Sequence, residues 1–92
     1  TEPKYRDWQI RCEQLLRPMW SGDPLERVQR MEMLFIGANR RMDLDNCIKA
    51  VLDVYVSCKI LRNDNLAVLD SLSANYHHAK DKDPCIIVKI FD

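Results

Sequence analysis

The chain is organised around residues 40–49, which read RRMDLDNCIK. Two carboxylates, Asp43 and Asp45, stand two positions apart in this stretch, after two arginines and before a lysine. The apolar run MEMLFI at residues 31–36 comes shortly before it and is typical of a strand. From Leu44 onward, apolar residues recur every three or four positions, which predicts a helix. We therefore expect the acidic pair at the junction between a strand and a helix.

A helix that begins at Leu44 places Asp43 at the N-cap position, where aspartate is favoured. Once this helix has started, Asp45, Lys49 and Asp53 follow at intervals of four residues and line one edge of it. The pattern thus gathers two carboxylates and a lysine within the first turns.

Closely spaced carboxylates with basic neighbours suit the hydrolysis of a phosphodiester. Mg²⁺ and Mn²⁺ prefer hard oxygen ligands, and a few carboxylates are enough to hold either ion. Lys49 could hold the scissile phosphate or orient the attacking water, and Arg40 and Arg41 could grip flanking phosphates. The residues therefore indicate a metal-dependent phosphodiesterase with Asp43 and Asp45 as ligands.

Two other functions fit the same residues. Aspartates at a helix start often act only as caps, with Lys49 as an ion-pair partner of Asp45, and the chain would then be non-catalytic. The second alternative is a small-phosphate hydrolase with a DxD motif. The dehalogenase-type motif has Thr or Val after the second aspartate, directly following an apolar strand, whereas this chain has Asn46 and two intervening arginines.

The run RRMDLDNCIKA at residues 40–50, a helix continuing through Asp53, and LRND at residues 61–64 resemble the RusA family of Holliday-junction resolvases. In that family an acidic residue follows the second aspartate by about nineteen positions, and Asp64 stands nineteen after Asp45. The resemblance extends from residue 40 to about residue 67.

This resemblance implies roles for six residues, a dimeric state and a reaction. Asp43, Asp45 and Asp64 would bind the metal, Lys49 would be the essential lysine, and Arg40 and Arg41 would contact DNA. Members of the family are homodimers with a mixed α/β fold that cut four-way DNA junctions using Mg²⁺. Their chains usually open with a strand and a Pro-Pro-x-x-Asn loop, and no such segment precedes Thr1. A fragment and a shortened form are the two explanations.

The 92 residues are enough for one small domain, which we expect to span residues 1–92. Hydrophobic residues make up 47% and charged residues 30%, as in an ordinary folded chain. No apolar run could cross a bilayer and no signal peptide opens the chain, so we expect a cytoplasmic protein without membrane contact.

The charges of the 14 basic and 14 acidic residues cancel, whereas DNA-binding proteins usually carry an excess of basic residues. Bound metal at the three proposed ligands would reduce the repulsion of DNA.

The four cysteines show no C-x-x-C spacing, so we expect free thiols rather than a zinc site.

The remaining helices and strands are predicted from apolar spacing and turn residues. We expect a first helix from about Thr1 to Pro18, a central strand over 26–36 buried on both faces, the second helix over 44–58, a strand over 66–76, a charged hairpin turn over 80–84, and a final strand over 85–91 antiparallel to the preceding one.

The second helix carries apolar residues on two sides, so two surfaces must cover it. Either the first helix or another subunit could provide the second cover.

Asp64 raises a question of distance. A helix of about fourteen residues carries the chain about 21 Å from Asp45, and the short segment 59–63 can return only about 3.3–3.6 Å per residue. Asp64 can meet its own Asp43 only if this segment is nearly straight or the helix ends early. Otherwise it would meet the acids of a two-fold-related partner.

The expected fold is one α/β (mixed α+β) domain with the order helix, strand, helix, strand, strand, RusA-like and forming an intertwined homodimer. The expected function is a Mg²⁺-dependent (or Mn²⁺-dependent), structure-selective endodeoxyribonuclease. It would resolve Holliday junctions in DNA recombination and repair, without a small-molecule cofactor. The alternative is a non-catalytic DNA-junction-binding or structural dimer that keeps the acidic cluster for capping.

Overall fold

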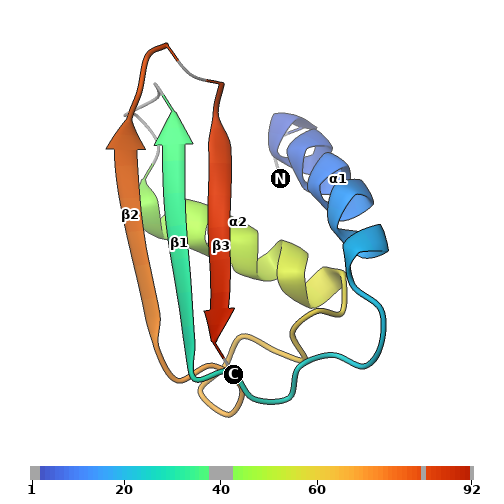
Figure 1. The fold of residues 1–92 in the computed structure, drawn as a ribbon. Helices are drawn as coiled ribbons and strands as arrows, with labels where there is room; N and C mark the ends of the chain where they lie inside the picture. The colour runs from blue at the N-terminus through green and yellow to red at the C-terminus, as the bar shows by residue number, and fades with distance from the viewer. Residues whose placement is uncertain (1–2, 38–42, 82, 92) are drawn as a thin grey trace.

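The computed structural model describes residues 3–37, 43–81 and 83–91, with side chains described from Arg6 onward (Figure 1). Its elements, in chain order, are α1 (Pro3–Leu16), the 3₁₀ helix η1 (Arg17–Met19), β1 (Arg30–Gly37), α2 (Leu44–Ser57), β2 (Leu72–His78) and β3 (Cys85–Phe91). The small α+β domain with a mixed sheet that the sequence predicts is therefore confirmed.

The sheet has the strand order β2-β1-β3. β1 runs parallel to β2, with Met31 beside Leu72, and antiparallel to β3, with Met31 beside Ile90. The expectation that β1 is central is correct. The expected hairpin between the last two strands is wrong, because β1 lies between them and β3 pairs with β1 (Figure 1).

Two strands begin later than the sequence patterns indicate. β1 begins at Arg30 rather than near residue 26, and β2 begins at Leu72 rather than near residue 66. The residues before each strand pair with each other instead: Leu25 bridges Leu61, and Val28 bridges Leu69. The apolar side chains of these residues close the end of the core. Their presence in the sequence therefore resembles the apolar pattern of a strand.

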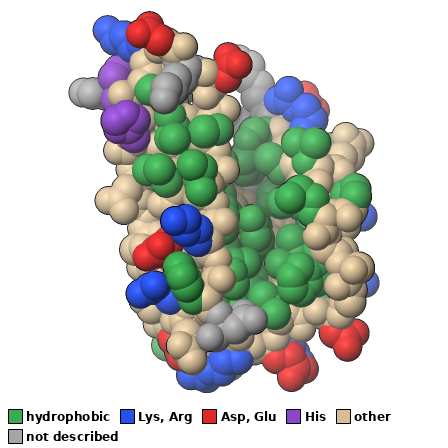
Figure 2. All heavy atoms as spheres, in the orientation of Figure 1, with side chains coloured by type: hydrophobic (Ala, Val, Ile, Leu, Met, Phe, Trp, Pro, Cys, Tyr) green, Lys and Arg blue, Asp and Glu red, His purple; other side chains and the backbone are tan. Residues whose placement is uncertain are grey.

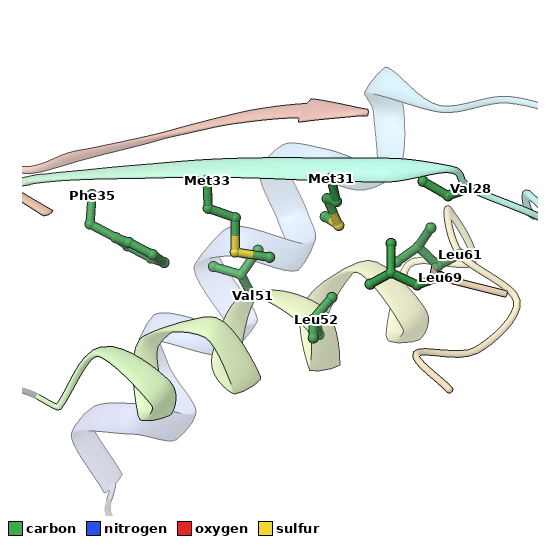
Figure 3. Close-up of a cluster of buried hydrophobic side chains, with 8 residues drawn as sticks. All are labelled: Val28, Met31, Met33, Phe35, Val51, Leu52, Leu61 and Leu69. Atoms are coloured by element: carbon green, nitrogen blue, oxygen red, sulfur yellow. The ribbon is translucent and has the colours of Figure 1, made fainter. Parts of the chain in front are cut away.

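The main core lies between the sheet and α2. Figure 3 shows Met31, Met33 and Phe35 pointing from β1 toward Val51 and Leu52 of α2. At the end of this layer, three further buried side chains fill the space beneath the start of β1: Val28, Leu61 and Leu69. Both helices lie on this side of the sheet, so the opposite face has no cover within the described chain (Figure 1).

The expectation that β1 is buried on both faces is therefore wrong. Its residues alternate between buried side chains, such as Met33, and half-buried ones, such as Glu32 and Leu34. The open face of the sheet is visible in Figure 2, where hydrophobic side chains gather on it and also line a hollow between β3 and α1.

The two apolar sides of α2 have different covers. One side packs on the sheet, and the other packs on α1, where Val54 and Cys58 meet Trp8, Cys12 and other α1 residues. The first of the two possible covers, α1, is thus the observed one. Leu15 and Met19, which the helical spacing would also place in the core, are 72% and 76% exposed because they follow the outer side of α1 and η1.

All four cysteines are free. Cys58 is buried, Cys12 and Cys47 are half-buried, and Cys85 is exposed. In the part of the chain that the structure describes, no helix has both the length and the apolar character that a membrane span requires.

Candidate functional site

Asp43 occupies the N-cap position of α2, as predicted. Its backbone is extended (φ −76°, ψ 136°), and its carbonyl oxygen accepts a hydrogen bond from the Cys47 amide at 3.2 Å. Its side chain, however, makes no capping hydrogen bond in the described chain. The helix start thus fixes the position of Asp43, while its exposed carboxylate makes no hydrogen bond to the helix backbone.

Asp45 lies in the first turn of α2 and is also exposed. Its Oδ1 accepts a hydrogen bond from the amide of the next residue, Asn46, at 2.9 Å. The pKa of the nearby Cys47 thiol is raised, first by burial and then by the negative charges of Asp43 and Asp45. Both carboxylates therefore act on one small region at the start of the helix, where the helix dipole favours negative charge.

Lys49 follows Asp45 by one turn and is exposed. No ion pair joins it to Asp45 or Asp53 among the described residues, so the simple salt-bridge interpretation has no support there. Arg40 and Arg41, the proposed DNA-contacting arginines, lie outside the described residues.

Asp64 lies far from this acidic pair. It belongs to the loop between α2 and β2, which Figure 1 shows at the opposite end of α2 from the start of that helix. With 14 residues, α2 is about 21 Å long. Within the described ranges, no three His, Cys, Asp or Glu side chains form a group that could hold a metal ion. One protomer therefore brings Asp43 and Asp45 together but keeps Asp64 apart from them.

The Asp64 loop is firmly shaped despite its exposure. The Asp64 amide donates to Oδ1 of Asn63 at 2.7 Å, and the Ala67 amide donates to Oδ1 of Asn65 at 3.1 Å. Such turns fix a loop backbone locally. Asp64 is thus held at a defined position on the surface.

The base of this loop is braced by residues 25–28. The Leu25 amide donates to Ile60 O at 2.8 Å, the Arg62 amide donates to Leu25 O at 3.0 Å, and the Val28 amide donates to Val68 O at 2.6 Å. Sequence reasoning missed this brace and assigned residues 26–28 to the central strand. Leu25 and Val28 stand three positions apart with Glu26 and Arg27 between them, and this short pattern does not distinguish a strand from a brace.

Two exposed ion pairs cross the same base. Arg62 meets Glu26 at 2.7 Å, and Arg27 meets Asp70 at 2.6 Å. Exposed pairs of this kind contribute at most about 1 kcal/mol each. Burial of Val28, Leu61 and Leu69 contributes more to holding the loop in place.

Tyr76 fixes the C-terminal end of β1. Its hydroxyl donates a hydrogen bond to the carbonyl oxygen of Gly37 at 2.8 Å and lies 3.2 Å from Nδ1 of His78. His77 and His78 are neighbours in β2 and therefore point to opposite faces of the sheet. Tyr76 and His78 therefore steady the point from which the chain leaves β1 toward the arginines.

Comparison with curated proteins identifies a similar sequence. The chain is 32% identical over 65 residues to the crossover junction endodeoxyribonuclease RusA of Aquifex aeolicus (strain VF5), a match that covers 70% of this chain and 52% of that protein. The chain thus matches about half the length of this relative. No protein-family model matches the chain, and no solved structure matches it. The similarity supports the RusA resemblance drawn from the sequence.

Proposed function

We propose that this chain is a RusA-like endodeoxyribonuclease that cuts Holliday junctions with Mg²⁺ or Mn²⁺. The observation that carries the proposal is the exposed pair Asp43 and Asp45, with the Asp43 carboxylate not engaged in capping and Lys49 one turn away. The similarity to a RusA endodeoxyribonuclease supports the same activity.

The donor set fits the proposed ion. Carboxylate oxygens are the hard ligands that Mg²⁺ prefers, and exposure leaves room for the waters that this ion retains. When bound, the metal would activate water as a nucleophile and offset the charge of the phosphate. Asp43 and Asp45 would hold the ion, and Asp64 would be the third ligand.

The basic residues would act on the DNA. Lys49, on the same helix edge as Asp45, would hold the scissile phosphate or orient the attacking water. Arg40 and Arg41 would grip phosphates on either side of the cut. Because phosphate contacts position DNA without reading its sequence, these residues account for binding rather than for sequence preference.

The position of Asp64 supports a homodimer in which each metal site is completed by the second copy. Asp64 lies beyond the opposite end of α2 from Asp43 and Asp45, so a site with all three carboxylates needs Asp64 from another chain. Two such sites related by a two-fold axis would also explain paired cuts across a junction that is itself two-fold symmetric.

The test is cleavage of a labelled four-way junction beside a matched linear duplex, with Mg²⁺ and with EDTA. We expect symmetric cutting of the junction that requires the metal, and we expect Asp43→Asn to abolish cutting while junction binding persists. Replacing Asp43 should not unfold the chain, because its carboxylate makes no capping bond in the described structure.

Two outcomes would count against the proposal. Cutting by Asp43→Asn at the parental rate would remove Asp43 from the site. Junction binding by the unaltered chain without any metal-dependent cutting would favour the non-catalytic binding dimer.

A further inference from the structure

We propose that Cys12 on α1 and Cys58 at the C-cap of α2 are a redox-active pair, which a small disulfide such as glutathione disulfide converts into a bond between the two helices. Both thiols are free in the structure. The inference concerns the contact between α1 and α2 and does not depend on the proposed nuclease activity.

The C-terminal end of α2 is fastened to α1 at one residue, Glu13. The Ser57 hydroxyl donates a hydrogen bond to Oε1 of Glu13 at 2.5 Å, and the Cys58 thiol donates a long, weak one to the carbonyl oxygen of Glu13 at 3.8 Å. Glu13 directly follows Cys12 in the chain. The sulfur of Cys58 therefore lies against the turn of α1 that contains Cys12.

Cys12 takes part in the same apolar contact. Cys58 belongs to a buried cluster around the C-terminal end of α2, and the α1 residues packed against this cluster are Trp8, Cys12 and Leu16. These three residues stand four positions apart, so they form one stripe along α1 with Cys12 at its centre. The stripe directs the Cys12 side chain toward the end of α2 that carries Cys58.

The electrostatics of the contact agree with this placement. Burial raises the pKa of the Cys12 thiol most, Arg11 lowers it, and negative charge on Cys58 and Glu13 raises it further. The pKa of the Tyr55 hydroxyl is raised in the same way, first by burial and then by Cys58 and Cys12. Each sulfur is thus close enough to the other, and to Tyr55, for its charge to act there.

The two thiols differ in exposure, and this sets the order of the reaction. Cys12 is half-buried and Cys58 is 8% exposed, so a small oxidant reaches Cys12 first. The Cys12 thiolate attacks one sulfur of glutathione disulfide, whose S–S bond breaks and releases one glutathione thiolate. The Cys58 thiolate then attacks the Cys12 sulfur and releases the second. The released thiolates take up the two protein protons, so the protein loses two hydrogen atoms and the oxidant becomes two glutathione molecules.

The other two cysteines lie elsewhere and serve as internal controls. Cys47 precedes Cys58 by eleven residues, which is about 16 Å along α2 and beyond the reach of a disulfide. Cys47 packs against the main core, and Cys85 is exposed on β3. Oxidation should therefore join Cys12 to Cys58 in preference to either of them.

The bond would also change the stability of the protein. It would join positions that stand 46 residues apart in the sequence. Closing a loop of this length removes much of the freedom of the unfolded chain, so the oxidised protein should melt about 10 °C or more above the reduced one. It would fix α1 to the end of α2 that leads into the Asp64 loop.

The experiment is incubation of the folded chain with glutathione disulfide, alkylation of the remaining thiols, and mass spectrometry of unreduced tryptic peptides. A lysine or arginine stands between successive cysteines, so trypsin places the four in different peptides. We expect a peptide pair joined through Cys12 and Cys58, two hydrogen atoms lighter than the separate peptides. Dithiothreitol should reverse both the bond and the rise in melting temperature.

Two variants test the order of the steps. Cys58→Ala should stop the reaction at a glutathione adduct on Cys12, whereas Cys85→Ala should form the bond as the unaltered chain does. Circular dichroism of the reduced variants checks that the fold is retained. The peptide map of the unaltered chain decides the question even where Cys58→Ala fails to fold.

Three results would overturn the inference. These are a peptide map of the oxidised chain without the Cys12–Cys58 pair, a pair that forms only after unfolding in urea, and equal melting temperatures of the oxidised and reduced chains. None of these measurements involves DNA or metal, so failure here and failure of the proposed nuclease function are separate outcomes.

Discussion

At the scale of single residues, the most informative side chains are those that the fold does not use. Asp43 has the backbone of an N-cap residue without the capping bond, and Lys49 has no ion-pair partner among the described carboxylates. Polar groups that a fold buries are almost always hydrogen-bonded within it, whereas exposed charges are available to a ligand. Charged groups that lie together without a capping bond or an ion pair are candidates for binding a ligand.

Lys49→Ala provides a test at this scale. We expect junction cleavage to fall by about 10²–10³-fold, because a charge that acts on the reacting phosphate is lost. Thermal stability should change little, since the side chain is exposed. Cleavage rate and melting temperature are measured on the same preparation. Lys89→Ala, at an exposed lysine on β3, is the control and should cleave at the parental rate.

The sequence alone was sufficient to propose these residues but not to place them. Asp43 and Asp45 could be assigned to a helix start because the apolar spacing after Leu44 is regular. The lack of a capping bond from Asp43 depends on its side-chain torsion angles, which no sequence pattern reports. Helix length alone limits how close Asp64 can come to Asp43 of the same chain. Only the fold of the loop shows that the two residues stay apart within one chain.

At the scale of elements, α2 is the best predicted part of the chain, and its C-terminal end leads into a residue with left-handed backbone. The helix ends at Ser57, and the C-cap residue Cys58 is followed by Lys59 with a φ of 61°. A residue with a β-carbon is disfavoured in this left-handed conformation, whereas glycine adopts it freely. The strain lies at the point where the chain turns toward the Asp64 loop.

Lys59→Gly should therefore stabilise the protein by about 0.5–1 kcal/mol, since relief of the left-handed strain outweighs the greater freedom of glycine in the unfolded chain. Lys59→Ala is the matched control, because alanine loses the same charge but keeps the strain, and it should show no gain. Urea denaturation measures both. Equal stability of the two variants would mean that the helix end carries no such strain.

The strands were harder to predict than the helices. Residues 26–28 and 66–69 were expected to belong to strands, but they brace each other at the base of the Asp64 loop instead of joining the sheet. Their partners are distant in sequence, and the few apolar residues in each segment suit a strand and a brace equally. The expected hairpin between β2 and β3 was wrong for a similar reason. Turn residues at 80–84 indicate that the chain reverses direction, but they do not show which strand β3 pairs with.

At the scale of the whole molecule, the arrangement of the acids at opposite ends of α2 makes a prediction about mixed dimers. Asp43→Asn and Asp64→Asn should each be inactive alone. When equal amounts are mixed and allowed to exchange, a mixed dimer has one site with both altered residues and one site with neither. About half of the dimers are mixed at random, so we expect about a quarter of the parental sites to return.

The measurement is nicking of the labelled junction by the mixture, since mixed dimers have one working site and cannot make paired cuts. A mixture of Asp43→Asn with Asp45→Asn is the control and should stay inactive, because both residues belong to the same half of the site. If the first mixture also stayed inactive while the unaltered chain cut, each protomer would have to complete its own site.

The central place of β1 has a consequence for how the chain folds. β1 finds both of its partner strands only among residues 72–91, about 40 to 60 positions later in the chain. While the chain emerges from the ribosome, the run MEMLFI has two bare hydrogen-bonding edges and little to cover it apart from α2. Truncation before Cys85 would leave one of these edges permanently open. Such shortened chains should therefore collect in inclusion bodies, and slow synthesis should cost this protein more yield than it costs an all-helical one of equal length.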